Sequence, residues 1–331
     1  LPISKIKIMK KNLRNLLVLS LGLITTIASA QWGATSTSWI NNTDADAREA
    51  WNRTTLTVDL SAIHVSADYK SNWNNLGTTQ GNAEVYEAYA STDLMGFGTL
   101  TMGRQDLSFG SGALISSDEW GWGKRYTTDG LDFAASFGGI DINAGTMSGI
   151  NANSNYMNAS GSFSGVSFNV LMIEESDVKS HGYDLGYSLM DGNLNIHYSM
   201  NEDGSGNEMT DMGGSYNVMD NVSIHGSMRK YEGTAGNTFT AANSAWNSGL
   251  AAGVLPHFTN GSEIMSYGLN YGLGDVSLGY TMHTLSMAGM ADDDMTDMTL
   301  SYNLNDNCTL GYRTYKSGNV EVNLITVGIG L

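Results

Sequence analysis

Apolar and polar residues alternate in short stretches along most of the chain. Between Ile63 and Lys70 every second side chain is polar, and residues 222–230 and 276–285 repeat this pattern. Alternation with a period of two is typical of a β-strand whose two faces meet different surroundings. No segment has a clear helical stripe, apart from a weak one at 240–255. The chain is therefore expected to be all-β.

The connections between these stretches alternate in length. Tight turns rich in Gly, Asn or Asp are expected at 95–96, 138–139, 191–192, 220–221, 274–275 and 306–307. Longer polar loops are expected at 71–81, 105–125, 175–180, 202–207, 232–262 and 286–294. This order is typical of a bacterial membrane barrel, which has short periplasmic turns and longer extracellular loops. A β-helix would show a repeat of fixed length, which the sequence lacks.

The pattern predicts eighteen strands. They lie near 32–40, 53–60, 62–70, 82–90, 97–104, 126–134, 140–148, 155–162, 166–174, 181–189, 193–201, 208–217, 222–230, 263–272, 276–285, 295–303, 308–315 and 320–331. The strand at 32–40 is inferred, because an outward strand must precede the inward strand at 53–60. The predicted fold is a transmembrane, antiparallel, up-and-down β-barrel of about eighteen strands. Sixteen strands are the alternative, if one weak pair is miscounted.

The last predicted strand changes its apolar parity near Leu324. Apolar residues fall on even numbers up to Leu324 and on odd numbers from Ile325 onward. This change predicts either a β-bulge near Leu324 or a strand whose outer end turns its apolar side inward.

The first thirty residues are expected to lie outside the folded protein. Residues 1–8 precede a plausible start at Met9 and resemble translated upstream sequence. Residues 9–30 have a basic start, an apolar core and a small-residue end, which together predict a signal peptide. Residues 31–331 are then expected to form a barrel in the outer membrane of a Gram-negative bacterium.

The charge balance argues against one class of partner. The chain has 16 Lys and Arg against 33 Asp and Glu, and five of those bases but no acid lie in residues 1–30. The expected mature chain therefore has 11 bases against 33 acids, and such a surface repels nucleic acids. Lone Cys308 excludes an internal disulfide.

If the apolar parity faces lipid, the polar parity faces a lumen. A solid core of charged residues would be costly, whereas a wet channel inside sixteen to eighteen strands accommodates them. The residues expected to line this pore are His64, Asp68, Lys70, Asp184, His197, Asp211, His225, Arg229, His283, Asp297 and Arg313. The alternative for each is a solvated wall residue without a selective role. The inward His residues lack the spacing of a metal site.

Two loops carry further candidates. Loop 105–125 combines aromatic and basic residues, so we expect it to form a constriction or a ligand-binding loop at the barrel mouth. Its candidate residues, with the strand end before it, are Arg104, Trp120, Trp122, Lys124 and Arg125. An aromatic girdle at the membrane interface is the alternative for tryptophans at strand ends. Loop 232–262 contains several apolar residues and is expected to pack over or into the pore.

A run of acids near the end of loop 286–294 offers a weak calcium site. Asp292, Asp293 and Asp294 supply oxygen ligands, with Asp297 nearby, but they lack the spacing of an EF-hand. A solvated loop is the default expectation, and no other cofactor or metal is expected. Loop acids that bridge to lipopolysaccharide through divalent cations are a further alternative.

One stretch resembles a known family. Gly103-Arg104-Gln105, followed by Phe109-Gly110, Trp120 and Asp129-Gly130, is similar to a segment of outer-membrane porins of the alginate-export type. The resemblance implies a monomeric barrel of about eighteen strands. The alginate exporter is similar to a conduit for anions that is lined with arginines, whereas residues 31–331 of this chain contain only six Arg. Parity also places Arg104 with Met102 at the outer rim, so the resemblance supports the architecture and not alginate as cargo.

The function expected from these patterns is a porin-like channel for passive diffusion of small hydrophilic solutes, with a modest preference for cations. Its expected surroundings are outer-membrane lipid and lipopolysaccharide, and a monomer is favoured over a trimer. The alternative is a non-conducting barrel that acts as an adhesin, scaffold or accessory subunit through its extracellular loops. An enzyme is not expected, because no catalytic triad or H-E-x-x-H motif is recognisable.

Overall fold

The computed structural model describes residues 31–41, 49–72, 80–116, 127–148, 153–240, 243–244, 259–318 and 320–330. The proposed upstream residues and signal peptide, residues 1–30, lie outside this part of the chain. No helix among the described residues has the length and hydropathy needed to cross a bilayer.

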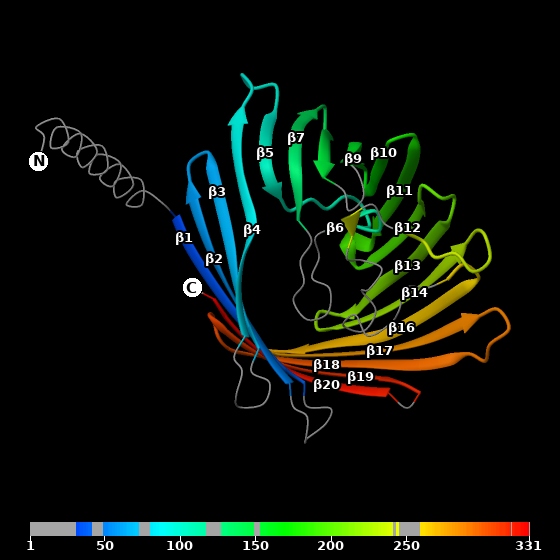
Figure 1. Ribbon diagram of the computed structural model, residues 1–331. Helices are drawn as coiled ribbons and strands as arrows, with labels where there is room; N and C mark the ends of the chain where they lie inside the picture. Colours follow the sequence, from blue (N-terminus) through cyan, green and yellow to red (C-terminus); the bar gives the residue numbers. More distant parts are fainter. Residues whose placement is uncertain are drawn as a thin grey trace, which may run out of the picture.

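The described residues form one closed ring of eighteen antiparallel strands (Figure 1). The first nine are β1 (Gln31–Asn41), β2 (Glu49–Leu60), β3 (Ile63–Asn72), β4 (Gln80–Asp93), β5 (Thr99–Gln105), β7 (Thr128–Phe137), β8 (Ile140–Ser148), β9 (Asn153–Phe163) and β10 (Val166–Glu175). The others are β11 (Val178–Leu189), β12 (Leu194–Glu202), β13 (Glu208–Met219), β14 (Val222–Glu232), β16 (Ser262–Leu273), β17 (Val276–Met287), β18 (Asp293–Asn305), β19 (Cys308–Ser317) and β20 (Val320–Gly330). β1 pairs with β20 and closes the ring. The predicted fold and the count of eighteen are confirmed, and the alternative of sixteen is wrong.

Five of the six loops expected to be long span five or more residues, and one does not. Turns of two residues join β2 to β3 and β7 to β8, whereas 22 residues separate β5 from β7. The exception is the loop expected at 175–180, which is a two-residue turn at Ser176–Asp177. Glu175 and Lys179 belong to strand ends, and Glu174 pairs directly with Lys179. Polar residues can stay in a strand at this level because strand ends reach beyond the hydrocarbon of the membrane.

The closing strand β20 decides between the two interpretations of its parity. Its register with β19 and with β1 is continuous, so it contains no β-bulge. Leu324 is 6% exposed, whereas its neighbour Ile325 is 36% exposed. The strand therefore turns its apolar side inward over its outer end.

The two faces of the wall differ as the alternation predicts. Large apolar side chains on the outer parity are exposed, among them Leu56, Met102 and Leu185. Polar side chains on the inner parity are buried, among them Asp68 and Asn158. A closed barrel with an apolar outer surface satisfies every requirement for a bilayer, and such bacterial barrels occupy the outer membrane. This chain is an outer-membrane barrel.

Two segments between strands lie inside the ring. β6 (Ile115–Ser116) pairs in parallel with β15 (Asn243–Ser244), although more than a hundred residues of chain separate them. Figure 1 shows β6 within the ring. Parts of the connections β5–β7 and β14–β16 therefore fold into the barrel and meet there.

Candidate functional site

An apolar belt lines the inside of the barrel at the end opposite the short turns. We call it the internal collar, and its residues are Met147, Tyr156, Leu171, Ile173, Met209, Tyr231, Ile264, Leu285, Met295 and Tyr315. Four residues from the two connections that enter the ring pack against the collar, each at most 1% exposed: Ala113, Leu114, Ile115 and Phe239. Burial of this apolar surface is the main force that holds these two connections inside this end of the barrel.

Polar contacts fix the path of residues 106–116, which we call the inward segment. Tyr86 donates a hydrogen bond to Asp106 Oδ2 at 2.9 Å, and Asn201 donates one to Ser111 Oγ at 3.3 Å. Phe109 packs against Tyr156 with ring centroids 5.3 Å apart. These contacts join the segment to β4, β9 and β12, so it is anchored on several sides of the lumen.

Gly110 brings the backbone of the inward segment against the wall. Its φ is +57°, a conformation that side chains disfavour. A Cβ at this position would lie 1.8 Å from Asp184 Oδ2 and 2.4 Å from Asn169 Nδ2. Any other residue would have to displace these two side chains and would adopt a strained backbone conformation.

A second set of contacts holds the inner part of the β14–β16 connection. Asp203 is 2% exposed and accepts hydrogen bonds from the backbone N–H groups of Ser205, Asn207 and Thr240. Asn260 donates to Asn207 Oδ1 at 2.6 Å. Asp203 therefore ties its own short loop, residues 203–207, to the segment that carries Phe239.

A cavity of about 1010 Å³ lies between the inward segment and the wall from β8 to β14. Its ionisable lining consists of four carboxylates, one guanidinium and one imidazole: Asp106, Asp141, Asp184, Asp211, Arg229 and His197. Asn143, Asn158 and Asn169 add amide groups. The volume suits a small molecule, and the lining is acidic.

The residues predicted to line the pore lie on the inner parity, and several contact one another. His64 lies between Asp59 and Glu87, at 2.6 and 3.3 Å. His225 Nε2 lies 3.1 Å from Thr281 Oγ1, and His283 Nδ1 lies 2.7 Å from Ser266 Oγ. Asp184, His197, Asp211 and Arg229 line the cavity itself.

Three of the basic residues of the inner wall are paired with acids. Arg229 Nη2 lies 2.7 Å from Asp211 Oδ2, and Lys70 Nζ lies 2.8 Å from Glu84 Oε2. Arg313 Nε donates to Asp297 Oδ1 at 2.9 Å. Asp68, also predicted to line the pore, accepts a hydrogen bond from Thr55 at 2.7 Å.

Asp141 and Asp184 have no basic partner among the described residues. Asp184 Oδ2 accepts a hydrogen bond from Asn169 at 3.1 Å, and its Oδ1 has no partner within the described residues. Asp141 is exposed to the lumen near the short turns. These two carboxylates leave the cavity side of the lumen with a net negative charge.

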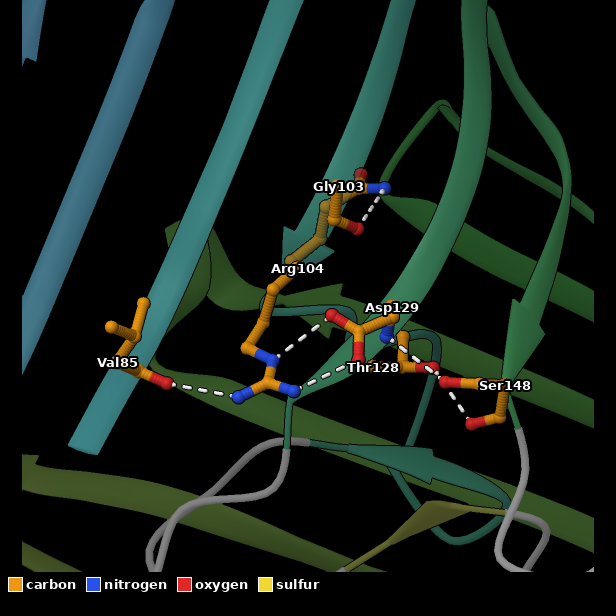
Figure 2. Close-up of polar contacts among 7 residues, drawn as sticks. Val85, Gly103, Arg104, Thr128, Asp129 and Ser148 are labelled. Carbon is orange, nitrogen blue, oxygen red and sulfur yellow. Dashed lines mark hydrogen bonds and ion pairs between the residues drawn. The ribbon is translucent and has the colours of Figure 1, made fainter.

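Arg104 lies on the outer face of the barrel, on the parity of exposed Met102 (Figure 2). It makes two hydrogen bonds to Asp129, at 2.9 and 3.0 Å, and a third to the carbonyl oxygen of Val85 at 3.1 Å. This pair joins β4, β5 and β7 from outside. The position fits the outer rim and not a constriction. Trp120, Trp122, Lys124 and Arg125 lie outside the described residues.

The sequence analysis missed several residues of the cavity. Asn143, Asn158 and Asn169 lie on the inner parity, so the same alternation could have identified them, but only charged residues and His were selected. Asp106 and the inward path of its segment had no periodic pattern that would reveal them.

The acids proposed for calcium do not converge in the structure. Asp293 and Asp294 are consecutive in β18, so their side chains point to opposite faces. Asp293 accepts from Ser317 at 2.7 Å, and Asp294 accepts from Thr284 at 2.8 Å. Within the described residues, no group of three His, Cys, Asp or Glu side chains is placed to hold a metal ion.

Comparisons with known proteins show the fold. The chain matches no protein-family model and no curated protein sequence. Among solved structures it is similar to Pseudomonas aeruginosa OccK5 (OpdH), with a TM-score of 0.71 at 10% identity over 91% of this chain and 98% of that one. It is also similar to P. aeruginosa OpdK with vanillate (TM-score 0.69, 12% identity, 92% and 99% coverage) and to OccK2 (OpdF) in complex with glucuronate (0.70, 13%, 92% and 97%). The chain has the closed 18-stranded fold of these outer-membrane porins.

Proposed function

We propose that this chain is a passive diffusion channel for small hydrophilic solutes and that it favours cations. The observation that carries the proposal is the acidic cavity, with four carboxylates against one guanidinium inside a closed barrel. Charges that line a confined aqueous path raise the local concentration of ions of the opposite sign.

The charge of the lumen also bears on the class of solute. Two of the similar structures contain vanillate and glucuronate, and both compounds are carboxylates. In this chain, inner-wall Arg229, Arg313 and Lys70 are each paired with an acid. We therefore do not expect selection of carboxylates, and cationic or neutral solutes fit better.

The resemblance to alginate-export porins enters this proposal only as a common architecture. Arg104, the arginine of that stretch, is paired with Asp129 on the outer face. Alginate is a polyanion, and an acidic lumen would repel it. We expect the barrel to act as a monomer among outer-membrane lipid and lipopolysaccharide.

The test is electrical measurement of the purified full chain in planar lipid bilayers. Under a KCl gradient, we expect stable conductance steps and a reversal potential whose sign shows preference for K⁺. Anion preference would overturn the charge argument, and a correctly folded barrel without conductance would overturn the channel itself.

A second candidate function has one observation in its favour. The inward segment and the residues around Phe239 pack tightly within the internal collar, which is the arrangement of a plugged barrel. A folded barrel that stays silent at all voltages would favour a non-conducting scaffold, accessory subunit or adhesin. Steady conductance would exclude it.

A further inference from the structure

A row of oxygen-rich side chains crosses the cavity wall along the direction of strand pairing, from the side of the short turns at Asp141 toward the opposite end of the barrel at Asp211. Strand pairing places them side by side in the order Asp141, Ser160, Asn169, Asp184, Ser199 and Asp211, from β8 to β13. We call this set the lateral row, and all six residues line the cavity. Adjacent strands lie about 4.8 Å apart, so Asp184 is roughly 10 Å from Asp211 and roughly 14 Å from Asp141.

Four hydrogen-bond donors around the cavity are already used. Asn169 Nδ2 donates to Asp184 Oδ2, and Asn143 Nδ2 donates to Asp132 at 3.0 Å. Tyr86 donates to Asp106, and Arg229 donates to Asp211. These donors all bond to acids of the protein itself.

The acceptors are not all used. Asn158 is 2% exposed, lines the cavity, and its Oδ1 has no hydrogen-bond partner within the described residues. Asp184 Oδ1 is buried and also lacks a partner there. A buried acceptor without a donor is costly, so both atoms favour a ligand that brings N–H groups.

From this imbalance we infer that the cavity is a binding site for solutes that carry an ammonium or guanidinium group. The inference rests on the proposed channel function and names its substrate class. Asp184 Oδ1 accepts a hydrogen bond from the cationic group, Asn158 Oδ1 offers a second acceptor two strands away for another N–H group of the solute, and Asp141 contributes charge from the side of the short turns. Both cationic groups have only donors and match a wall of acceptors. A carboxylate would meet an excess of like charge, because the one guanidinium of the lining, Arg229, is already paired with Asp211.

The test uses agmatine, which carries an amine and a guanidinium group and no carboxylate. Purified full chain in planar bilayers is titrated with agmatine, and interruptions of the single-channel current give an apparent dissociation constant. We expect Asp184→Asn to weaken this constant about tenfold, because it removes a charged acceptor and preserves shape. Asp141→Asn is the second variant; its side chain makes no contact that the fold requires, and it is expected to weaken binding as well.

The matched control is Asp191→Asn, in the turn after β11 and outside the cavity. Asp191 has a φ of +56°, a conformation that asparagine accepts, so only charge changes. Glutarate serves as the anionic control and should leave the current unchanged. Equal agmatine constants in wild type, Asp184→Asn and Asp191→Asn would overturn the site, as would a conducting channel that agmatine never interrupts.

A silent barrel would contradict the channel but not the site. In that case, calorimetric titration of the detergent-solubilised chain with agmatine tests the binding site independently of conductance. Binding that is lost in Asp184→Asn and kept in Asp191→Asn would support the site in a non-conducting barrel. Absence of binding would overturn it.

Discussion

At the scale of single residues, the same charge has different consequences on the two faces of the wall. Arg229 faces the lumen and is paired with Asp211, whereas Arg104 faces outward and is paired with Asp129. Each pair cancels one carboxylate. Only the inner pair influences ions in the pore.

This difference predicts the selectivity of charge variants. Arg229→Gln should uncover the charge of Asp211 and raise the preference for K⁺ over Cl⁻ roughly twofold, as expected for one unit charge at wet-pore distances. Reversal potentials under a KCl gradient measure the effect. Arg104→Gln removes the same charge from the outer face and should leave the potential unchanged. Equal shifts in both variants would contradict the assignment of the two faces.

A second residue-scale prediction concerns the lipid-facing side chains. Leu56 lies near the middle of β2, on the outer parity, and is 52% exposed. Leu56→Arg should destabilise the barrel by about 2–4 kcal/mol, the cost of a charge near the bilayer midplane. Thr57→Arg, on the lumenal parity one position later, should cost much less. Urea unfolding in lipid vesicles compares the two, and similar losses would argue against a wet lumen.

At the scale of elements, the inward segment controls the width of the mouth. Its backbone touches the wall at Gly110, where even a methyl group would collide with Asp184 and Asn169. Gly110→Ala should therefore loosen the segment at this contact and raise single-channel conductance.

The control for this prediction is Gly138→Ala. Gly138 has a similar φ of +61°, but a Cβ there would meet nothing within 4 Å. Both variants carry the backbone cost of about 1 kcal/mol for a side chain in this conformation. If the two conduct alike, the docking of the inward segment does not limit the current.

The elements also show what sequence alone can predict. Alternation predicted the wall strands after residue 50, because each strand has one face on lipid and one on the lumen, and the order of short and long connections added the strand at 32–40. It failed at 175–180, where polar residues at the membrane rim resemble a loop. It could not identify the pairing of β6 with β15, because these residues come from loops without periodicity and meet only in the folded barrel.

At the scale of the whole molecule, the site is an arrangement of neighbours in the ring. Asp141 and Asp211 are seventy residues apart in the chain but belong to one row of paired residues in the wall. Parity predicted that Asp184 and Asp211 face inward. It could not predict that they lie in the same row, because that depends on register across several hairpins, or that the inward segment lies beside them.

The pairing of β1 with β20 has a consequence for the life of the barrel in a crowded membrane. An open sheet presents a row of unsatisfied N–H and C=O groups at each edge, to which a strand from another chain can add. The closed ring has no such row, so neighbouring barrels in the same bilayer find no template for β-augmentation. At the junction between the first and last strands, Thr35–Asn41 pair with Leu324–Gly330 in the same antiparallel way as neighbouring strands elsewhere in the ring.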